Sequence, residues 1–315
     1  MAFEPVVLFF LLGVIAGLAK SDLKIPTAVY EALSVYLLLA IGITGGVKLA
    51  ESTLLPLILP GLAILLVGCL IPLICYPVLQ YFGGLKRADS ASLAAHYGSV
   101  SVVTFSVAVA FLAQAGLDYE GHMVVFLVLL GIPALVVGIL LARAGMAGKT
   151  RWGKTLREVF FGKSIFLLIG GLIIGFAAGP DHIGPLEPLF FDLFKGLLAF
   201  FLLEMGLVAA AKIADFRYYG KFLIGFAIVM PVFSAVLGVF LGWGLGLSLG
   251  GTLLLATLYA SASYIAAPAA MRIAVPEANP ALSIGASLGV TFPFNIFVGV
   301  PLYFWMADLL YSMGG

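Results

Sequence analysis

The chain has 315 residues, of which 63% are hydrophobic and 10% are charged, and its formal net charge is +1. Soluble proteins carry about 25% charged residues, so this composition excludes a soluble enzyme, a nucleic-acid-binding protein, a disordered chain and a disulfide-rich secreted domain. The apolar runs are continuous and do not alternate with polar residues, which excludes a β-barrel pattern. The composition therefore predicts an all-α polytopic membrane protein.

Apolar runs between charged residues and Pro or Gly breaks predict ten membrane-spanning helices. They cover residues 4–19, 27–47, 53–82, 89–115, 121–143, 163–178, 187–210, 218–244, 250–274 and 279–311. The first run has no basic region before it and no small-residue cleavage site after it. We expect a retained helix there and no signal peptide.

Charge placement predicts the orientation of these helices. The connection between residues 143 and 163 contains six Lys or Arg residues and one acid, so by the positive-inside rule it is cytoplasmic. Counting helices outward from it places 14 of the 16 basic residues on the cytoplasmic side, and leaves Lys48 and Lys195 outside with both termini. We expect Lys48 and Lys212, at the ends of helices, to extend to the lipid headgroups.

Two sequence motifs recur in the same order in the two halves of the chain. Residues 42–51 align with 206–215, and residues 93–101 align with 255–263. Each half holds five predicted helices, and because five is odd, the second half must cross the membrane inverted. We predict a first repeat over 1–145, a basic cytoplasmic linker over 146–162 and a second repeat over 163–315. Chance similarity between apolar segments is the alternative.

The fourth predicted helix of each half carries a tyrosine followed by two serines in mid-membrane. The serines are Ser99 and Ser101 in the first half and Ser261 and Ser263 in the second. A weakly helical stretch follows each pair, with Thr104 in one and Pro268 in the other. Irregular backbone inside a membrane must line a cavity or be buried in protein, so we predict two discontinuous helices that cross near the midplane.

Two half-helix ends that meet inside the membrane can bind small ions. Free N–H groups and the positive ends of half-helices favour a small anion, whereas hydroxyl and carbonyl oxygens favour Na⁺. The alternative is that these small residues only let helices pack closely. Two ionisable residues inside predicted helices, Glu204 and His96, are candidates for coupling transport to an ion or a proton; the alternative is that they are only hydrogen-bonded within the bundle. Asn295 could bind a cation or bridge helices, and we expect the bridge.

Signals for an enzyme are absent from the sequence. We find no metal-ligand spacing and no phosphate-binding loop, and Cys69 and Cys75 lie in one apolar run. We therefore predict no catalytic residues, no metal site, no cofactor and no nucleic-acid partner. Membrane lipids are the expected partners of the basic linker.

At these motifs the sequence resembles the sodium-dependent bicarbonate transporter family known from cyanobacteria, as a divergent bacterial homologue, along nearly the whole chain. The matching residues are Ile41 to Gly46; Asp89, Gly98, Val100, Ser101 and Thr104; Ile132 to Val136; Ser261, Ser263, Ile265, Pro268 and Arg272; and Pro276, Ala278 to Pro280 and Ile284 to Ser287. Tyr264 stands where the family has Asp, and Gly131 replaces a second family acid.

The resemblance implies ten helices in a five-plus-five inverted repeat, with a mobile core beside a gate domain in an elevator-type mechanism. It implies Na⁺-coupled bicarbonate uptake across the cell (inner) membrane, a homotrimer and a PII-like cytoplasmic regulator. The site residues it implies, with those of the serine motifs, are Thr44, Ser99, Ser101, Thr104, Ser261, Ser263 and Tyr264. Two alternatives remain open: a symporter that couples another small anion to protons, and a receptor or structural subunit of the same fold that has lost transport.

Overall fold

The computed structural model describes residues 5–51, 57–143, 153, 157, 161–216 and 220–314. Within these ranges the chain is helical and contains no β-strand. The α-helices are α1 (Pro5–Leu18), α2 (Thr27–Ala50), α3 (Ile58–Pro77), α4 (Arg87–Gly98), α5 (Val102–Ala115), α6 (Met123–Arg143), α8 (Lys163–His182), α9 (Phe194–Phe216), α10 (Gly220–Gly244), α11 (Leu249–Ala260), α12 (Ala266–Ala274), α13 (Pro280–Ala286), α14 (Phe292–Phe294) and α15 (Val300–Gly314). Short 3₁₀ or π turns join some of them: η2 (Val78–Phe82), η3 (Gly184–Leu186), η4 (Pro188–Asp192), η5 (Ser287–Thr291) and η6 (Asn295–Gly299).

Eight of the described helical segments are long and apolar enough to cross a membrane. The prediction of an all-helical, multi-pass membrane protein is therefore confirmed. Two further apolar helices, α1 with 14 residues and α11 with 12, are shorter. At 1.5 Å per residue they extend about 21 and 18 Å, less than the ~30 Å hydrocarbon core, so these lengths do not establish the predicted count of ten.

The helix ends follow local sequence signals, with some differences from the prediction. The straight part of α8 ends before Gly179, whose φ of 60° interrupts the helix ahead of Pro180. The predicted helix over 187–210 starts as the π turn η4 and continues as α9 to Phe216. Most of the predicted linker, 146–162, and the side chain of Lys212 lie outside the described residues.

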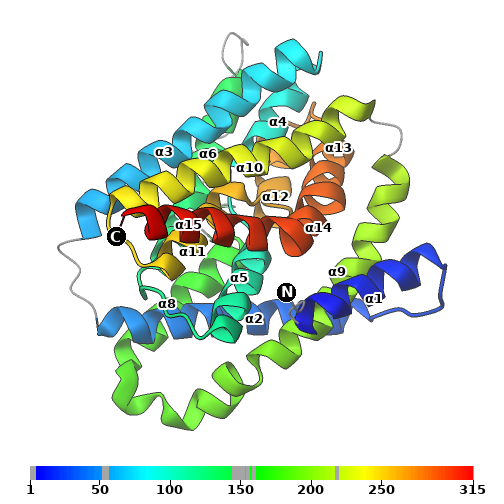
Figure 1. Cartoon of the computed structure of the whole chain (residues 1–315). Helices are drawn as coiled ribbons and strands as arrows, with labels where there is room; N and C mark the ends of the chain where they lie inside the picture. The colour runs from blue at the N-terminus through cyan, green and yellow to red at the C-terminus, as the bar shows by residue number, and fades with distance from the viewer. Residues whose placement is uncertain are drawn as a thin grey trace.

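Helices α1, α2, α8 and α9 form what we call the scaffold group, in which α2 packs along α8 and α1 packs across α9 (Figure 1). Glycines allow these backbones to touch. A Cβ atom on Gly42 would lie 2.6 Å from the carbonyl oxygen of Leu168, and one on Gly206 would clash with the carbonyl oxygen of Phe10. Close backbone packing thus holds the scaffold group together.

The remaining helices form what we call the central group, in which α3, α4 and α6 pack together and α10, α11 and α15 pack together. Polar contacts link the helix starts of the two halves. Asp89 Oδ1, at the start of α4, accepts a hydrogen bond from the backbone N–H of Asn279 at 2.7 Å. Glu120, just before α6, accepts hydrogen bonds from the N–H and, at 3.0 Å, the hydroxyl of Ser248 ahead of α11. Each contact satisfies groups at a helix terminus.

Candidate functional site

Both serine motifs coincide with ends of helices. α4 ends at Gly98 and α5 begins at Val102, while α11 ends at Ala260 and α12 begins at Ala266. Between them the backbone is extended: Ser101 has φ −109° and ψ 114°, and Ser261 has φ −83° and ψ 161°. The N–H and C=O groups at these helix ends therefore lie in the protein interior without partners in their own helices, and they need hydrogen-bond partners from elsewhere.

Ser101 provides several of those partners. Its hydroxyl oxygen accepts the N–H of Thr104 at 3.2 Å, which caps the start of α5, and its hydroxyl lies 3.2 Å from the Tyr264 oxygen, to which it donates. The backbone N–H of Ser101 donates to the Ser261 hydroxyl oxygen at 2.9 Å. One residue of the first half is thus bonded to two residues of the second.

Ser263 makes a contact in the opposite direction. Its backbone N–H donates to the carbonyl oxygen of His96, in the last turns of α4, at 2.9 Å. Its hydroxyl oxygen accepts the N–H of Ala267 in the first turn of α12 at 3.1 Å. Each non-helical segment is therefore bonded to the other half of the chain, and a serine hydroxyl binds an N–H at the start of the helix that follows.

Asn295 satisfies the carbonyl at the end of α11. Its side-chain amide donates to the Ala260 oxygen at 2.9 Å, and its amide oxygen accepts from the Tyr303 hydroxyl at 2.7 Å. The Asn295 side chain is completely buried. The prediction that Asn295 bridges helices is confirmed, because the amide joins the end of α11 to the last helical segment of the chain.

A small cavity lies where the two non-helical segments meet. It has a volume of about 30 Å³ and is lined by Val100–Val102 and Ser263–Ala266. That is about the share of one molecule in liquid water. Because α5 and α12 both begin beside it, their positive ends border the cavity, while Ser101 and Tyr264 contribute hydroxyl groups to its wall.

The other predicted site residues occupy different places. Ser99 donates weakly to the Gly131 oxygen at 3.4 Å. His96 is completely buried; its Nδ1 donates to the Ser92 oxygen at 2.7 Å, and its Nε2 has no hydrogen-bond partner in the part of the chain that the structure describes. Thr44 lies on α2, where its hydroxyl donates to the Ala40 oxygen and it lines a separate, larger cavity.

Glu204 does not lie among the residues that line the small cavity. It is half-buried on α9, within electrostatic reach of the Tyr30 hydroxyl on α2. Both residues belong to the scaffold group. The structure thus brings Ser101, Thr104, Ser261 and Tyr264 into one hydrogen-bonded cluster. Ser263 lines the same small cavity, whereas Glu204 and Thr44 lie on helices of the other group.

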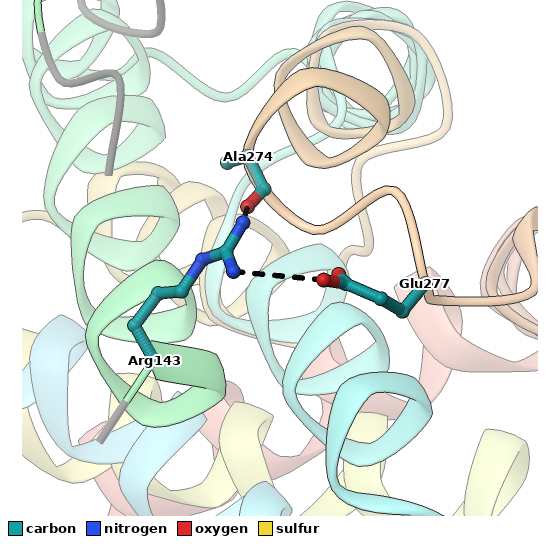
Figure 2. A network of polar contacts seen from close by, with 3 residues as sticks. All are labelled: Arg143, Ala274 and Glu277. Carbon is teal, nitrogen blue, oxygen red and sulfur yellow. Dashed lines mark hydrogen bonds and ion pairs between the residues drawn. The ribbon is translucent and has the colours of Figure 1, made fainter. Parts of the chain in front are cut away.

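Figure 2 shows a contact that positions the far end of α12. The Arg143 guanidinium, at the end of α6, donates to the Ala274 oxygen at 2.6 Å and lies 3.5 Å from the Glu277 carboxylate. Since Ala274 is the last residue of α12, the cation sits at the negative end of that helix. In the sequence Arg143 is one of the basic residues of the predicted cytoplasmic connection, and no local pattern indicates this contact.

Lys48 has a protein partner that the sequence did not indicate. Its ammonium group lies 3.7 Å from the centre of the Tyr119 ring and donates to the Tyr119 carbonyl oxygen at 3.4 Å. An aromatic face and a carbonyl replace part of the water that a headgroup position would supply. Burial, and secondarily the charge of Asp118, raise the pKa of Tyr119 to about 12, so the ring under Lys48 stays protonated.

Apolar spanning helices around a buried hydroxyl and amide cluster define a multi-pass membrane protein with a polar site inside the protein. Within the described ranges, no three His, Cys, Asp or Glu side chains are placed to hold a metal ion.

The chain belongs to the Na⁺-dependent bicarbonate transporter superfamily, whose family model matches residues 5–308. The resemblance predicted from the motifs is thereby confirmed. No curated protein matches the sequence.

Proposed function

We propose that this protein is a sodium-coupled bicarbonate transporter that moves its substrate by an elevator-type mechanism. The observation that carries the proposal is the reciprocal bonding of the two interrupted helices, Ser101 to Ser261 and Ser263 to His96. The starts of α5 and α12 both border one small cavity. Secondary transporters with inverted repeats bind substrate at such paired half-helix starts.

The groups around the cavity suit an anion and a cation of small size. The positive ends of α5 and α12 would stabilise the bicarbonate charge, as helix N-termini stabilise other anions. The hydroxyls of Ser101 and Tyr264, with nearby carbonyl oxygens, would supply oxygen ligands for Na⁺, which prefers such hard donors. Because no carboxylate lines this cavity, we propose that Na⁺ is bound through neutral oxygens and the charge of the anion.

The contacts between helices support the inverted repeat. The second helix of the first half packs on the first helix of the second half, α2 on α8, and the corresponding pair is α9 on α1. The fourth helix of each half is likewise bonded to the fifth of the other, through Asp89 with Asn279 and through Ser248 with Glu120. In the proposed mechanism the central group slides as a body along the scaffold group.

The proposal includes the orientation and the partners that the sequence suggests. Both termini lie outside, the basic linker is cytoplasmic, the protein assembles as a trimer, and a PII-like protein binds from the cytoplasm. Cysteines introduced at Lys149 and Lys154 should react with impermeant thiol reagents only from the cytoplasm, and one at Gly315 only from outside. Labelling at Gly315 from the cytoplasm contradicts this orientation.

The transport function is tested by reconstitution into liposomes. Labelled bicarbonate should enter when Na⁺ is supplied, and not when choline replaces it. Ser101→Leu and Ser263→Leu should abolish uptake, because each removes a hydroxyl and fills the cavity, while Ser312→Leu, at an exposed position, is the matched control. Sodium-independent uptake, or normal uptake by both cavity variants, refutes the proposed site.

The two alternative functions give different results in the same assays. If bicarbonate and Na⁺ raise the melting temperature but no uptake occurs, the protein is a receptor or structural subunit that binds without transport. If uptake follows a pH gradient without Na⁺, coupling is to protons. Glu204→Gln should then abolish the pH dependence of uptake. His96→Gln is measured in the same assay, because His96 is the other candidate for proton coupling.

A further inference from the structure

A larger cavity separates the two groups of helices. It has a volume of about 330 Å³, roughly ten times the share of one water molecule in the liquid. Thr44 and Lys48 line it from α2 of the scaffold group, and Phe105 and Val109 line it from α5 of the central group. The cavity therefore lies at the boundary along which the central group would move.

One end of this cavity approaches the small cavity between the interrupted helices. Phe105 follows Thr104 directly in α5 and is 1% exposed. The Phe105 backbone N–H donates to the carbonyl oxygen of Ser101 at 3.0 Å. A solute in the large cavity is thus separated from the serine cluster by the Phe105 side chain and the first turn of α5.

The walls of the large cavity combine apolar surface with balanced charge. Two ammonium groups, of Lys48 and Lys195, and two carboxylates, of Asp118 and Asp192, line it. Most of the other lining side chains are aliphatic or aromatic. Asp118, Asp192 and Lys195 are exposed and Lys48 is half-buried. One ion entering alone would leave an uncompensated charge among these four groups, whereas an anion and a cation together preserve the balance.

We propose that the large cavity is an entry site that binds one small monovalent anion together with one monovalent cation, before they pass Phe105 to the serine cluster. Lys48 and Lys195 contact the anion, and Asp118 and Asp192 contact the cation. The identity of the two ions, bicarbonate and Na⁺, rests on the proposed function. The site gives coupling a physical origin, since each ion lowers the cost of admitting the other.

Protection of an introduced cysteine tests this proposal without measuring transport. In a Cys69→Ala, Cys75→Ala background, Val109→Cys places a thiol on the cavity wall, and an impermeant maleimide is added to intact cells. Sodium bicarbonate should slow the modification at least threefold, whereas choline bicarbonate and sodium gluconate should each have less than half that effect. A cysteine at Ser312, an exposed position, is the control for bulk salt effects.

Charge variants identify the groups involved. Lys48→Gln should lose the protection and Lys48→Arg should keep it, because the arginine retains the positive charge; Asp192→Asn should lose the sodium requirement. Equal protection by choline bicarbonate, or none by sodium bicarbonate, overturns the proposal. Sodium-dependent uptake without protection overturns the entry site alone, whereas protection without uptake supports the site and overturns the transport function.

Discussion

The amide of Asn295 is expected to be a main polar support of the interrupted helix pair, and Asn295→Leu tests this. The variant keeps a side chain of similar size but loses the hydrogen bonds to the Ala260 carbonyl and from the Tyr303 hydroxyl. Both partners are buried. An unsatisfied buried polar group costs about 1–3 kcal/mol, while hydrogen bonds between membrane helices average about 0.6 kcal/mol, so we expect a loss of about 2 kcal/mol.

The loss should be visible in a thermal melt of the purified protein. With an unfolding entropy of about 2.1 cal/mol/K per residue, 1 kcal/mol corresponds to about 1.5 °C for a chain of 315 residues, so Asn295→Leu should melt about 3 °C lower. Tyr303→Phe removes only one of the two bonds and should cost about half as much. Because the two side chains contact each other, the double variant should be less destabilised than the sum of the single ones, by about 1 kcal/mol. Strict additivity, or a melting point within 1 °C of the parent for Asn295→Leu, refutes the reasoning.

Three further predictions concern other parts of the molecule. Gly206→Leu should prevent assembly of the scaffold group, because any Cβ there clashes with the Phe10 carbonyl, while Gly196→Leu, with no atom within 4 Å of its Cβ position, should express normally; equal expression contradicts the packing argument. Arg143→Met should reduce bicarbonate uptake more than Arg143→Lys, since lysine keeps a cation at the end of α12; equal activities would show that the charge is dispensable. Burial lowers the pKa of His122, against a smaller opposing effect of Glu120. The folded protein therefore binds fewer protons than the unfolded chain just below pH ~6.5, so stability should fall as the pH drops through that range; a His122→Phe variant with the same pH profile would exclude this histidine.

Local sequence features account for the helices and for where several of them end. Continuous apolar runs specify spanning helices because each backbone group must be bonded within its own segment in lipid. The two serine motifs coincide with the ends of α4 and α11, and Gly179 with the interruption of α8. Asn295 was also interpretable from sequence, because an amide inside an apolar segment needs a partner.

Tertiary structure decided which distant groups meet. Ser101 and Ser261 are 160 residues apart in the chain, and Arg143 and Ala274 are 131 apart. Hydropathy and helix periodicity describe only a few turns at a time, so they indicated neither the guanidinium at the end of α12 nor the position of Lys48 on Tyr119. The cavity between α2 and α5 is likewise lined by segments far apart in the chain, such as Thr44 with Val109 and Lys195. Its existence depends on how packed helices are spaced, which no single segment specifies.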